Sequence, residues 1–130
     1  MAKELAIATK IKGTENSTVQ ALENLICALP QADFPLDHFF SDGIYARKMT
    51  APASALLVGK THLHNHLAIL LKGQVAIHSR NGIAIYQAPY VINVLAGDKR
   101  AFFAVTEVEW ITIHATEETD LDVLEENLAL

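Results

Sequence analysis

Residues 59–73 read GKTHLHNHLAILLKG, and this segment is the most informative one in the chain. Three histidines at alternate positions, His62, His64 and His66, lead into a short apolar run between two glycines. Because successive side chains of an extended chain point to opposite faces, the three imidazoles are predicted to share one face of a strand. The apolar run HLAILL has the length of a single β-strand.

The segments on both sides also consist of short apolar runs. From residue 44 to residue 114, short apolar or alternating runs are separated by Gly, Pro, Asn or Asp, which is typical of an all-β protein. Asn81-Gly82 can supply the two positive φ angles of a type I′ turn, which predicts a β-hairpin. The predicted strands are IYARKM (44–49), ALLVGK (55–60), HLAILL (66–71), QVAIHS (74–79), GIAIYQ (82–87), YVINVL (90–95), AFFAV (101–105) and VEWITIH (108–114).

Helical spacing occurs on either side of these strands. Residues 17–29 predict an amphipathic helix that ends at Pro30, and Leu121, Leu124 and Leu128 predict a short C-terminal helix. No long helix separates the strands, whereas parallel crossovers would need one. The predicted fold is therefore an all-β, antiparallel β-barrel of jelly-roll type, with a β-sandwich as the alternative.

The segment before the strands has no clear pattern. Residues 30–43, PQADFPLDHFFSDG, contain two prolines and no period, which predicts an irregular lead-in with Phe34, Phe39 and Phe40 under the barrel. We expect one domain, in which residues 1–40 form the helix and lead-in packed on the barrel. Residues 41–130 would then form the barrel and its C-terminal helix.

The composition limits the function classes. A content of 51% hydrophobic residues in 130 predicts an ordered domain with a sizeable core. The net charge of −5 disfavours binding to nucleic acid or to a membrane surface. Cys27 is the only cysteine, so no intramolecular disulfide can form, and the first 13 residues are too charged for a signal peptide. These features predict a cytoplasmic protein.

Two segments carry a resemblance to a known family. Residues 59–73 and LAGDKR at residues 95–100 resemble the two motifs of the cupin superfamily, in the same order and with Asn81-Gly82 between them. The first motif carries an HxH pair, a glutamate and a closing glycine, and the second has the form PxGxxH. The resemblance implies a cupin-type jelly roll with its ligands at one end of the barrel.

The chain departs from that pattern at the glutamate. Aligned on its closing glycine, the first motif has His66 at the glutamate position. Aligned on His62 and His64 as the HxH pair, it has Ala68 or Ile69 there. Neither alignment restores the carboxylate, so at least one of the usual metal ligands is missing.

The chain also resembles small cupin-like proteins encoded by bacteriophages. The likeness rests on PASALLVGKTHLHNHLAILLKG, on the proline of QAPY and on AGDKRAFF. It implies a location in the host cytoplasm or in the virion, with a virion protein as a possible partner. Cupin-like barrels commonly pair, and exposed sheet edges invite pairing, so a dimer or larger homo-oligomer is expected.

The histidine triplet predicts either a metal site or a polar barrel mouth without a metal. Alternate residues of a strand are about 6.6 Å apart, whereas metal–nitrogen bonds measure about 2.0–2.1 Å. All three imidazoles could reach one ion only if the chain bends near Asn65, or if His78 or His114 supplies a ligand. The candidate metals are Zn, Ni, Fe and Mn.

Arg100 occupies the histidine position of the second motif. An arginine stays cationic and cannot bind a metal, but its planar fork fits a carboxylate or a phosphate. The alternative is a structural ion pair with Asp98, Glu107 or Glu109. The candidate ligand-binding residues are Arg100, Tyr45, Arg47 and His114.

The sequence is compatible with three functions. Tyr45 and Arg47 share parity, so they point together either into the barrel or toward solvent. The incomplete set of metal ligands favours an accessory protein, in a phage or bacterial setting, that binds a small anionic ligand or a protein partner. The histidines could instead serve a metal-dependent enzyme, and the phage resemblance would fit a virion-associated assembly protein.

Overall fold

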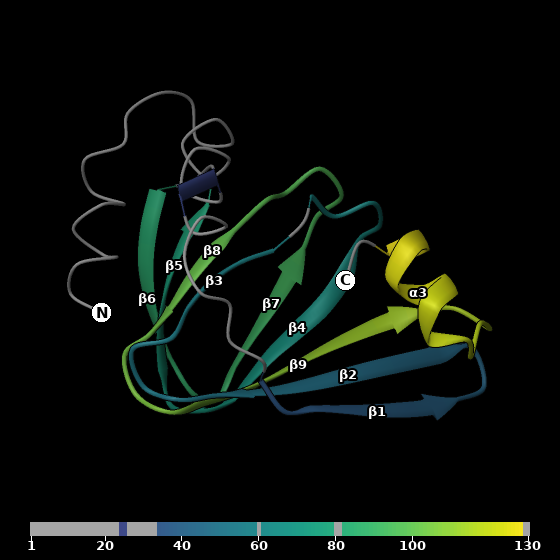
Figure 1. Ribbon diagram of the computed structural model, residues 1–130, viewed down its shortest axis with the longest axis horizontal. Helices are drawn as coiled ribbons and strands as arrows, with labels where there is room; N and C mark the ends of the chain where they lie inside the picture. The colour runs from purple at the N-terminus through teal and green to yellow at the C-terminus, as the bar shows by residue number, and fades with distance from the viewer. Residues whose placement is uncertain (1–23, 26–33, 60, 80–81, 129–130) are drawn as a thin grey trace.

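The computed structural model describes residues 24–25, 34–59, 61–79 and 82–128. Within them, nine β-strands form two antiparallel sheets that face each other, and one helix, α3 (Leu121–Leu128), lies beside one end (Figure 1). The larger sheet has the order β1-β2-β9-β4-β7 and the smaller one β3-β8-β5-β6, which is a jelly-roll barrel. The strands are β1 (Leu36–Ser41), β2 (Ile44–Ala51), β3 (Leu56–Val58), β4 (His66–Lys72), β5 (Gln74–Ser79), β6 (Gly82–Gln87), β7 (Tyr90–Val94), β8 (Ala101–Ala104) and β9 (Val108–Ala115).

Most of the predicted elements are confirmed. Strands β2 to β9 are the eight predicted ones, and their ends agree to within two residues. The C-terminal helix is also present as α3, where the Asp120 carboxylate accepts hydrogen bonds from the Asp122 and Val123 amides and caps the first turn. The predicted helix at residues 17–29 lies outside the described residues, apart from Asn24 and Leu25, which are helical.

The β5–β6 hairpin forms as predicted, but its turn is shifted by one residue. Ser79 pairs with Gly82, so Arg80 and Asn81, which lie outside the described residues, connect the strands. Gly82 is therefore the first residue of β6 rather than the second residue of the turn. Its φ of +94° is one that a side chain would disfavour.

The prediction of an irregular segment through residue 43 was wrong. Residues 36–41 form β1, which pairs with β2 along its whole length. Both prolines precede this strand, so neither interrupts it, and an edge strand needs only one partner. Phe34 packs against the core as expected, whereas Phe39 and Phe40 are exposed.

The inner face of the five-stranded sheet is polar at one end and apolar at the other. Across β2, β9 and β4, the register aligns Arg47, Thr112 and Ala68 in one row. The row toward the core aligns apolar side chains, and Trp110 there meets Phe102 of the opposite sheet at a ring-centroid distance of 5.2 Å. The buried core consists of Ala51, Ala55, Ala68, Leu70, Val75, Ile77, Val94, Ala104, Val108 and Trp110.

Gly73 turns the chain from β4 of one sheet to β5 of the other. Its φ is +88°, and a Cβ there would collide with the Glu107 carbonyl and lie 2.6 Å from Thr106 Oγ1. Only glycine fits this close approach. The glycine that closes the first sequence motif is therefore required by the passage between the sheets.

Candidate functional site

The two motif segments of the sequence meet at one end of the barrel. The His62 amide donates to the Asp98 carbonyl at 2.9 Å, and the Gly97 amide donates to the His62 carbonyl at 2.8 Å. The Gly59 amide donates to the Arg100 carbonyl at 3.0 Å. These backbone bonds hold the loop of residues 61–65 against residues 95–100. We call this end, with the adjoining starts of β2 and β4 and the end of β9, the barrel mouth.

Three imidazoles gather at the mouth. The ring centroids of His62 and His66 are 4.8 Å apart, and those of His66 and His114 are 4.4 Å apart. His66 begins β4, and His114 lies beside it on β9, one position from the Leu67–Ile113 pair. The His62–His66–His114 set is called the imidazole cluster below.

The cluster differs from the predicted triplet in one member. His64 is exposed, and its carbonyl oxygen accepts a hydrogen bond from His66 Nδ1 at 3.2 Å. The side chain of His64 has only the smallest of the effects that lower the pKa of His114. The parity argument holds for an extended strand, but residues 61–65 form a loop, so His62 and His64 need not point the same way. His114 joins the cluster instead, because cross-strand register brings β9 next to β4.

The hydrogen bond at His66 sets its tautomer. A carbonyl oxygen can only accept, so His66 Nδ1 carries the proton and Nε2 keeps its lone pair. His114 Nε2 lies 2.9 Å from Thr112 Oγ1. The cluster therefore has at least one nitrogen that can accept a hydrogen bond or bind an ion.

Burial and neighbouring cations keep the imidazoles neutral. Burial, with further contributions from His66 and Arg100, lowers the pKa of His62 to about 4. Burial, followed by the effects of His66 and Arg47, lowers the pKa of His114 to about 3. Burial and both guanidiniums lower the pKa of His66 as well. At neutral pH the cluster is uncharged.

Arg100 lies at the mouth and is 9% exposed. Its Nη2 is 3.3 Å from Asp98 Oδ2, so the predicted ion pair with Asp98 is present. Glu107 and Glu109 are instead partnered by lysines of the outer face. The Nε–H of Arg100 is buried and has no acceptor in the described part of the chain. A buried donor without an acceptor is costly, so this group is suited to a ligand oxygen.

Arg47 points inward from β2, because it lies two positions after buried Tyr45 and therefore on the same face of the strand. It is half-buried, and burial lowers its pKa, while Tyr45 and Glu125 of α3 act in the opposite direction. Its positive charge acts on all three imidazoles of the cluster. Two guanidiniums from different elements therefore face one uncharged imidazole cluster.

Tyr45 is also inward, but it belongs to the wall of the mouth. Its ring is fully buried and forms a cluster with Leu124 and Leu128 of α3. Its phenol oxygen lies 2.7 Å from His38 Nδ1, and burial raises the pKa of the phenol. His38 was not selected from the sequence, because only the pairing of β1 with β2 brings it to Tyr45.

The imidazole cluster offers nitrogen donors to a metal ion. Within the described residues, no group of three or more His, Cys, Asp or Glu side chains is arranged to hold a metal ion. The imidazoles are in the neutral form that a metal requires, but a cation would sit beside two guanidiniums with few carboxylates to balance it. The residues fit an anion better than they fit a metal.

Comparisons with known proteins identify the fold. An RmlC-like cupin family protein with a double-stranded β-helix fold from Methanocaldococcus jannaschii superposes with a TM-score of 0.56 and 10% identity, over 65% of this chain and 82% of that one. An RmlC-like cupin from Shewanella frigidimarina gives 0.57 and 16% identity, over 68% and 80%. The fold is the RmlC-like cupin fold.

Other comparisons agree with that identification or add nothing to it. The Schizosaccharomyces pombe Cnp3 cupin domain matches this cupin-fold chain at a TM-score of 0.56 and 16% identity, over 78% of this chain and 76% of that domain. No family model matches the sequence, and no curated protein matches it. No helix in the described residues is long and apolar enough to cross a membrane.

Proposed function

We propose that this cupin-fold protein binds a small organic acid or phosphate at the barrel mouth. The observation that carries the proposal is the Nε–H of Arg100, a buried donor with no acceptor among the described residues. Arg47 adds a second positive charge to the same space. An anion bound there would accept from Arg100 and offset both charges.

The neutral imidazoles complement these cations. His66 keeps a lone pair on Nε2, and His62 and His114 are uncharged, so the cluster can donate to or accept from a polar ligand without repelling the guanidiniums. Charge-assisted hydrogen bonds in a partly buried site are about twice as strong as neutral ones. A carboxylate or phosphate is the chemistry that this combination selects.

The resemblance to phage-encoded proteins suggests where such binding would act. An accessory protein in the host cytoplasm or in a virion could use the anion as a ligand without any reaction. Fold likeness alone does not transfer a reaction, because one fold carries many unrelated sites.

A metal-dependent enzyme is the second candidate. The observation in its favour is the His66 tautomer, in which Nε2 is available to an ion such as Zn, Ni, Fe or Mn. His62 and His114 could contribute two further nitrogens after a small rearrangement of the rings. Water activated on such an ion would be the reactive group.

Thermal-shift screening with acetate, oxalate, citrate and inorganic phosphate tests the first candidate. At least one anion is expected to raise the melting temperature of the wild type, and Arg100→Ala should reduce its affinity tenfold or more, since hydrogen bonds to charged groups contribute roughly 1.5–3 kcal/mol. Arg47→Ala should have the same direction and a smaller effect.

The matched control is Lys48→Ala, which removes a cation from the same strand as Arg47 but on the opposite face. It should leave anion binding unchanged. No stabilisation by any anion, or the same stabilisation in Arg100→Ala as in the wild type, would contradict the proposal. Stoichiometric metal in protein purified without a histidine tag, lost in His66→Ala, would favour the enzyme instead.

A further inference from the structure

The imidazole cluster is a row of three rings with His66 in the middle. The ring centroid of His66 lies 4.8 Å from that of His62 and 4.4 Å from that of His114. His62 belongs to the loop of residues 61–65, whereas His114 lies on β9. The two ends of the row therefore meet different parts of the barrel wall.

Arg100 lies at the His62 end of the row. The Asp98 carbonyl accepts a hydrogen bond from the His62 amide, and the Asp98 carboxylate lies 3.3 Å from Arg100 Nη2. Asp98 thus connects this guanidinium to the loop that carries His62. Burial, His66 and then Arg100 lower the pKa of His62 to about 4, and Arg47 has the smallest effect there.

Arg47 lies at the His114 end. It pairs with Thr112 of β9, and Thr112 Oγ1 lies 2.9 Å from His114 Nε2. Burial, His66 and then Arg47 lower the pKa of His114 to about 3, and Arg100 is not among the charges that act on this imidazole. A row of neutral imidazoles therefore separates two cations.

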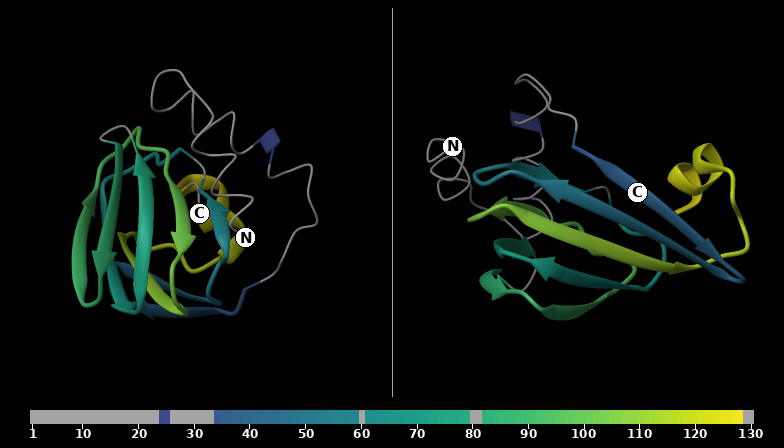
Figure 2. Two further views of the ribbon diagram at one scale, coloured as in Figure 1. Left: turned by 90° about the vertical axis from the view of Figure 1, so that its left-hand side faces the viewer. Right: turned by 90° about the horizontal axis from the view of Figure 1, so that it is seen from below.

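Both guanidiniums have N–H groups left for a ligand. Nη2 of Arg100 is paired with Asp98, whereas its buried Nε–H has no acceptor in the described part of the chain. Glu125 of α3 acts on the charge of Arg47, but no ion pair joins Arg47 to a described residue. Figure 2 shows α3 at the end of the five-stranded sheet where β2 begins and β9 ends.

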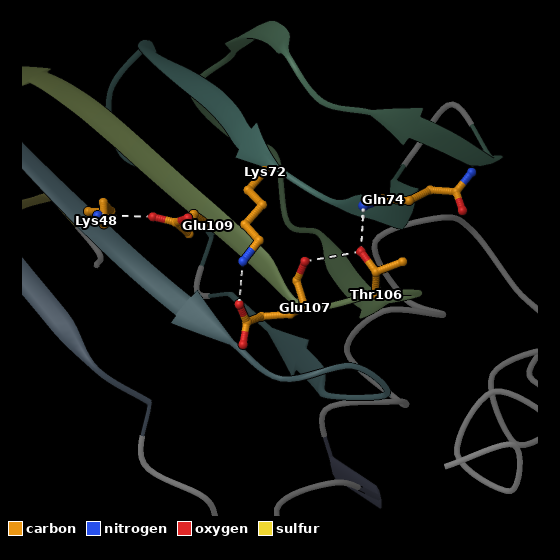
Figure 3. A network of polar contacts seen from close by, with 6 residues as sticks. All are labelled: Lys48, Lys72, Gln74, Thr106, Glu107 and Glu109. Carbon is orange, nitrogen blue, oxygen red and sulfur yellow. Dashed lines mark hydrogen bonds and ion pairs between the residues drawn. The ribbon is translucent and has the colours of Figure 1, made fainter.

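Elsewhere on the same sheet the cations already have partners. Lys48 Nζ lies 3.1 Å from Glu109 Oε1, and Lys72 Nζ lies 2.7 Å from Glu107 Oε1 (Figure 3). Each of these lysines has a carboxylate of its own. At the mouth, the described carboxylates leave one guanidinium with an unpartnered N–H and the other without an ion pair, so an external anion can bind at each end of the row.

We infer that the mouth binds a dicarboxylic acid, with one carboxylate on Arg100, the other on Arg47 and the carbon spacer along the imidazole cluster. This ligand class rests on the anion binding proposed above and narrows it. A single carboxylate at one end would leave the other guanidinium without a counter-charge, whereas a diacid offsets both. Succinate and glutarate have such a spacer, whereas the two carboxylates of oxalate are bonded directly to each other.

Isothermal titration of the full chain near neutral pH tests this inference. Succinate and glutarate are compared with their monomethyl esters, which have the same carbon spacer and one negative charge fewer. In the wild type, the better diacid should bind roughly five- to tenfold more tightly than its monoester, because its second carboxylate forms hydrogen bonds with a charged group. Oxalate should bind less tightly than that diacid. This comparison needs only the wild type, so it does not depend on the folding of a variant.

Two variants assign the carboxylates. Arg47→Ala should weaken the diacid to about the affinity of its monoester, and it should change the monoester by about twofold or less, because a screened charge that makes no contact contributes little. Arg100→Ala should weaken both ligands. The matched control is Lys48→Ala, which removes a cation from the opposite face of the same strand and should keep the preference for the diacid.

The outcomes distinguish this inference from the proposed function. Equal binding of diacid and monoester, with both weakened in Arg100→Ala, would overturn the inference and leave the anion site in place. Absence of binding by every acid would overturn both. A full diacid preference that persists in Arg47→Ala would overturn the place of the second carboxylate. Oxalate binding tighter than that of either longer diacid, and lost after treatment with EDTA, would indicate a metal and also overturn the inference.

Discussion

The two ends of the inner face of the five-stranded sheet share three strands and one register. At one end these strands contribute Tyr45, His114 and His66, and two rows further along they contribute apolar side chains such as Trp110 and Leu70. We call these the polar end and the apolar end. The backbone is the same in both, so the difference lies in the side chains alone.

The comparison shows how one barrel separates stability from binding. At the apolar end, close packing of side chains from both sheets stabilises the fold. At the polar end, burying imidazoles and guanidiniums costs stability unless they find partners. A fold under selection for stability alone has no need of buried polar side chains, and the ligand proposed above would supply the partners that the polar end lacks.

The largest effect is expected at the apolar end. Leu70→Ala removes a fully buried side chain between the sheets and should lower the free energy of unfolding by about 2–5 kcal/mol. The adjacent Leu71→Ala, at an exposed position, should change it by about 0.5 kcal/mol or less. Urea unfolding measures both. A similar loss in the two variants would remove the assignment of the core to this end.

The buried imidazoles of the polar end should make the free energy of unfolding depend on pH. The pKa values of His62 and His114 are lowered to about 4 and about 3, so between pH 6.5 and pH 3 the unfolded chain binds more protons than the folded one. Their contribution is complete above pH 6.5 and is lost as the pH falls. Each imidazole can add a slope of at most about 1.4 kcal/mol per pH unit.

His114→Gln should reduce this slope, as measured by urea unfolding at a series of pH values. His64→Gln is the matched control, because that side chain is exposed and has the smallest of the effects that lower the pKa of His114, so the slope should change less. Equal slopes in His114→Gln and in the wild type would mean that the imidazole is as accessible to protons in the folded chain as in the unfolded one. The polar end would then not be buried as described.

The smallest effect is expected at the edge of the polar end. Glu125 of α3 acts on the charge of Arg47, so Glu125→Gln should strengthen anion binding roughly two- to fivefold, the size of a typical surface ion pair. Glu126→Gln removes the same charge from the next position of the helix and should change binding less. Isothermal titration with the tightest anion distinguishes them. Equal effects would show that only the net charge of the helix matters.

The predictable part of the fold depended on local signals. Strands β2 to β9 were predicted because each segment contains apolar or alternating apolar and polar residues and is bounded by residues such as Gly, Asn or Pro. These signals lie within a few residues of one another. Strand β1 was missed because its residues show only weak alternation, and its pairing with β2 stabilises it. The turn at Asn81-Gly82 was found but misplaced by one residue, since register is set by the partner strand.

The candidate site could likewise be predicted only in part. The residue types and the two motif segments were evident from the sequence, and Tyr45 and Arg47 were predicted to share one face of a strand. Whether that face points inward was left open by the alternation alone. Replacement of His64 by His114 in the imidazole cluster was not evident, because the two histidines lie 50 positions apart in the sequence. Neither the approach of His38 to Tyr45 nor that of Glu125 to Arg47 leaves a local signal.

By itself, the sequence determined the strands, the hairpin and the presence of histidine and arginine near one end of a barrel, because periodicity and turn chemistry act over a few residues. Only the tertiary structure decided which imidazoles meet, that Arg100 keeps a buried Nε–H without an acceptor in the described residues, and at which end of the imidazole cluster each guanidinium lies. These depend on strand register and burial, which are set by contacts between residues far apart in the chain.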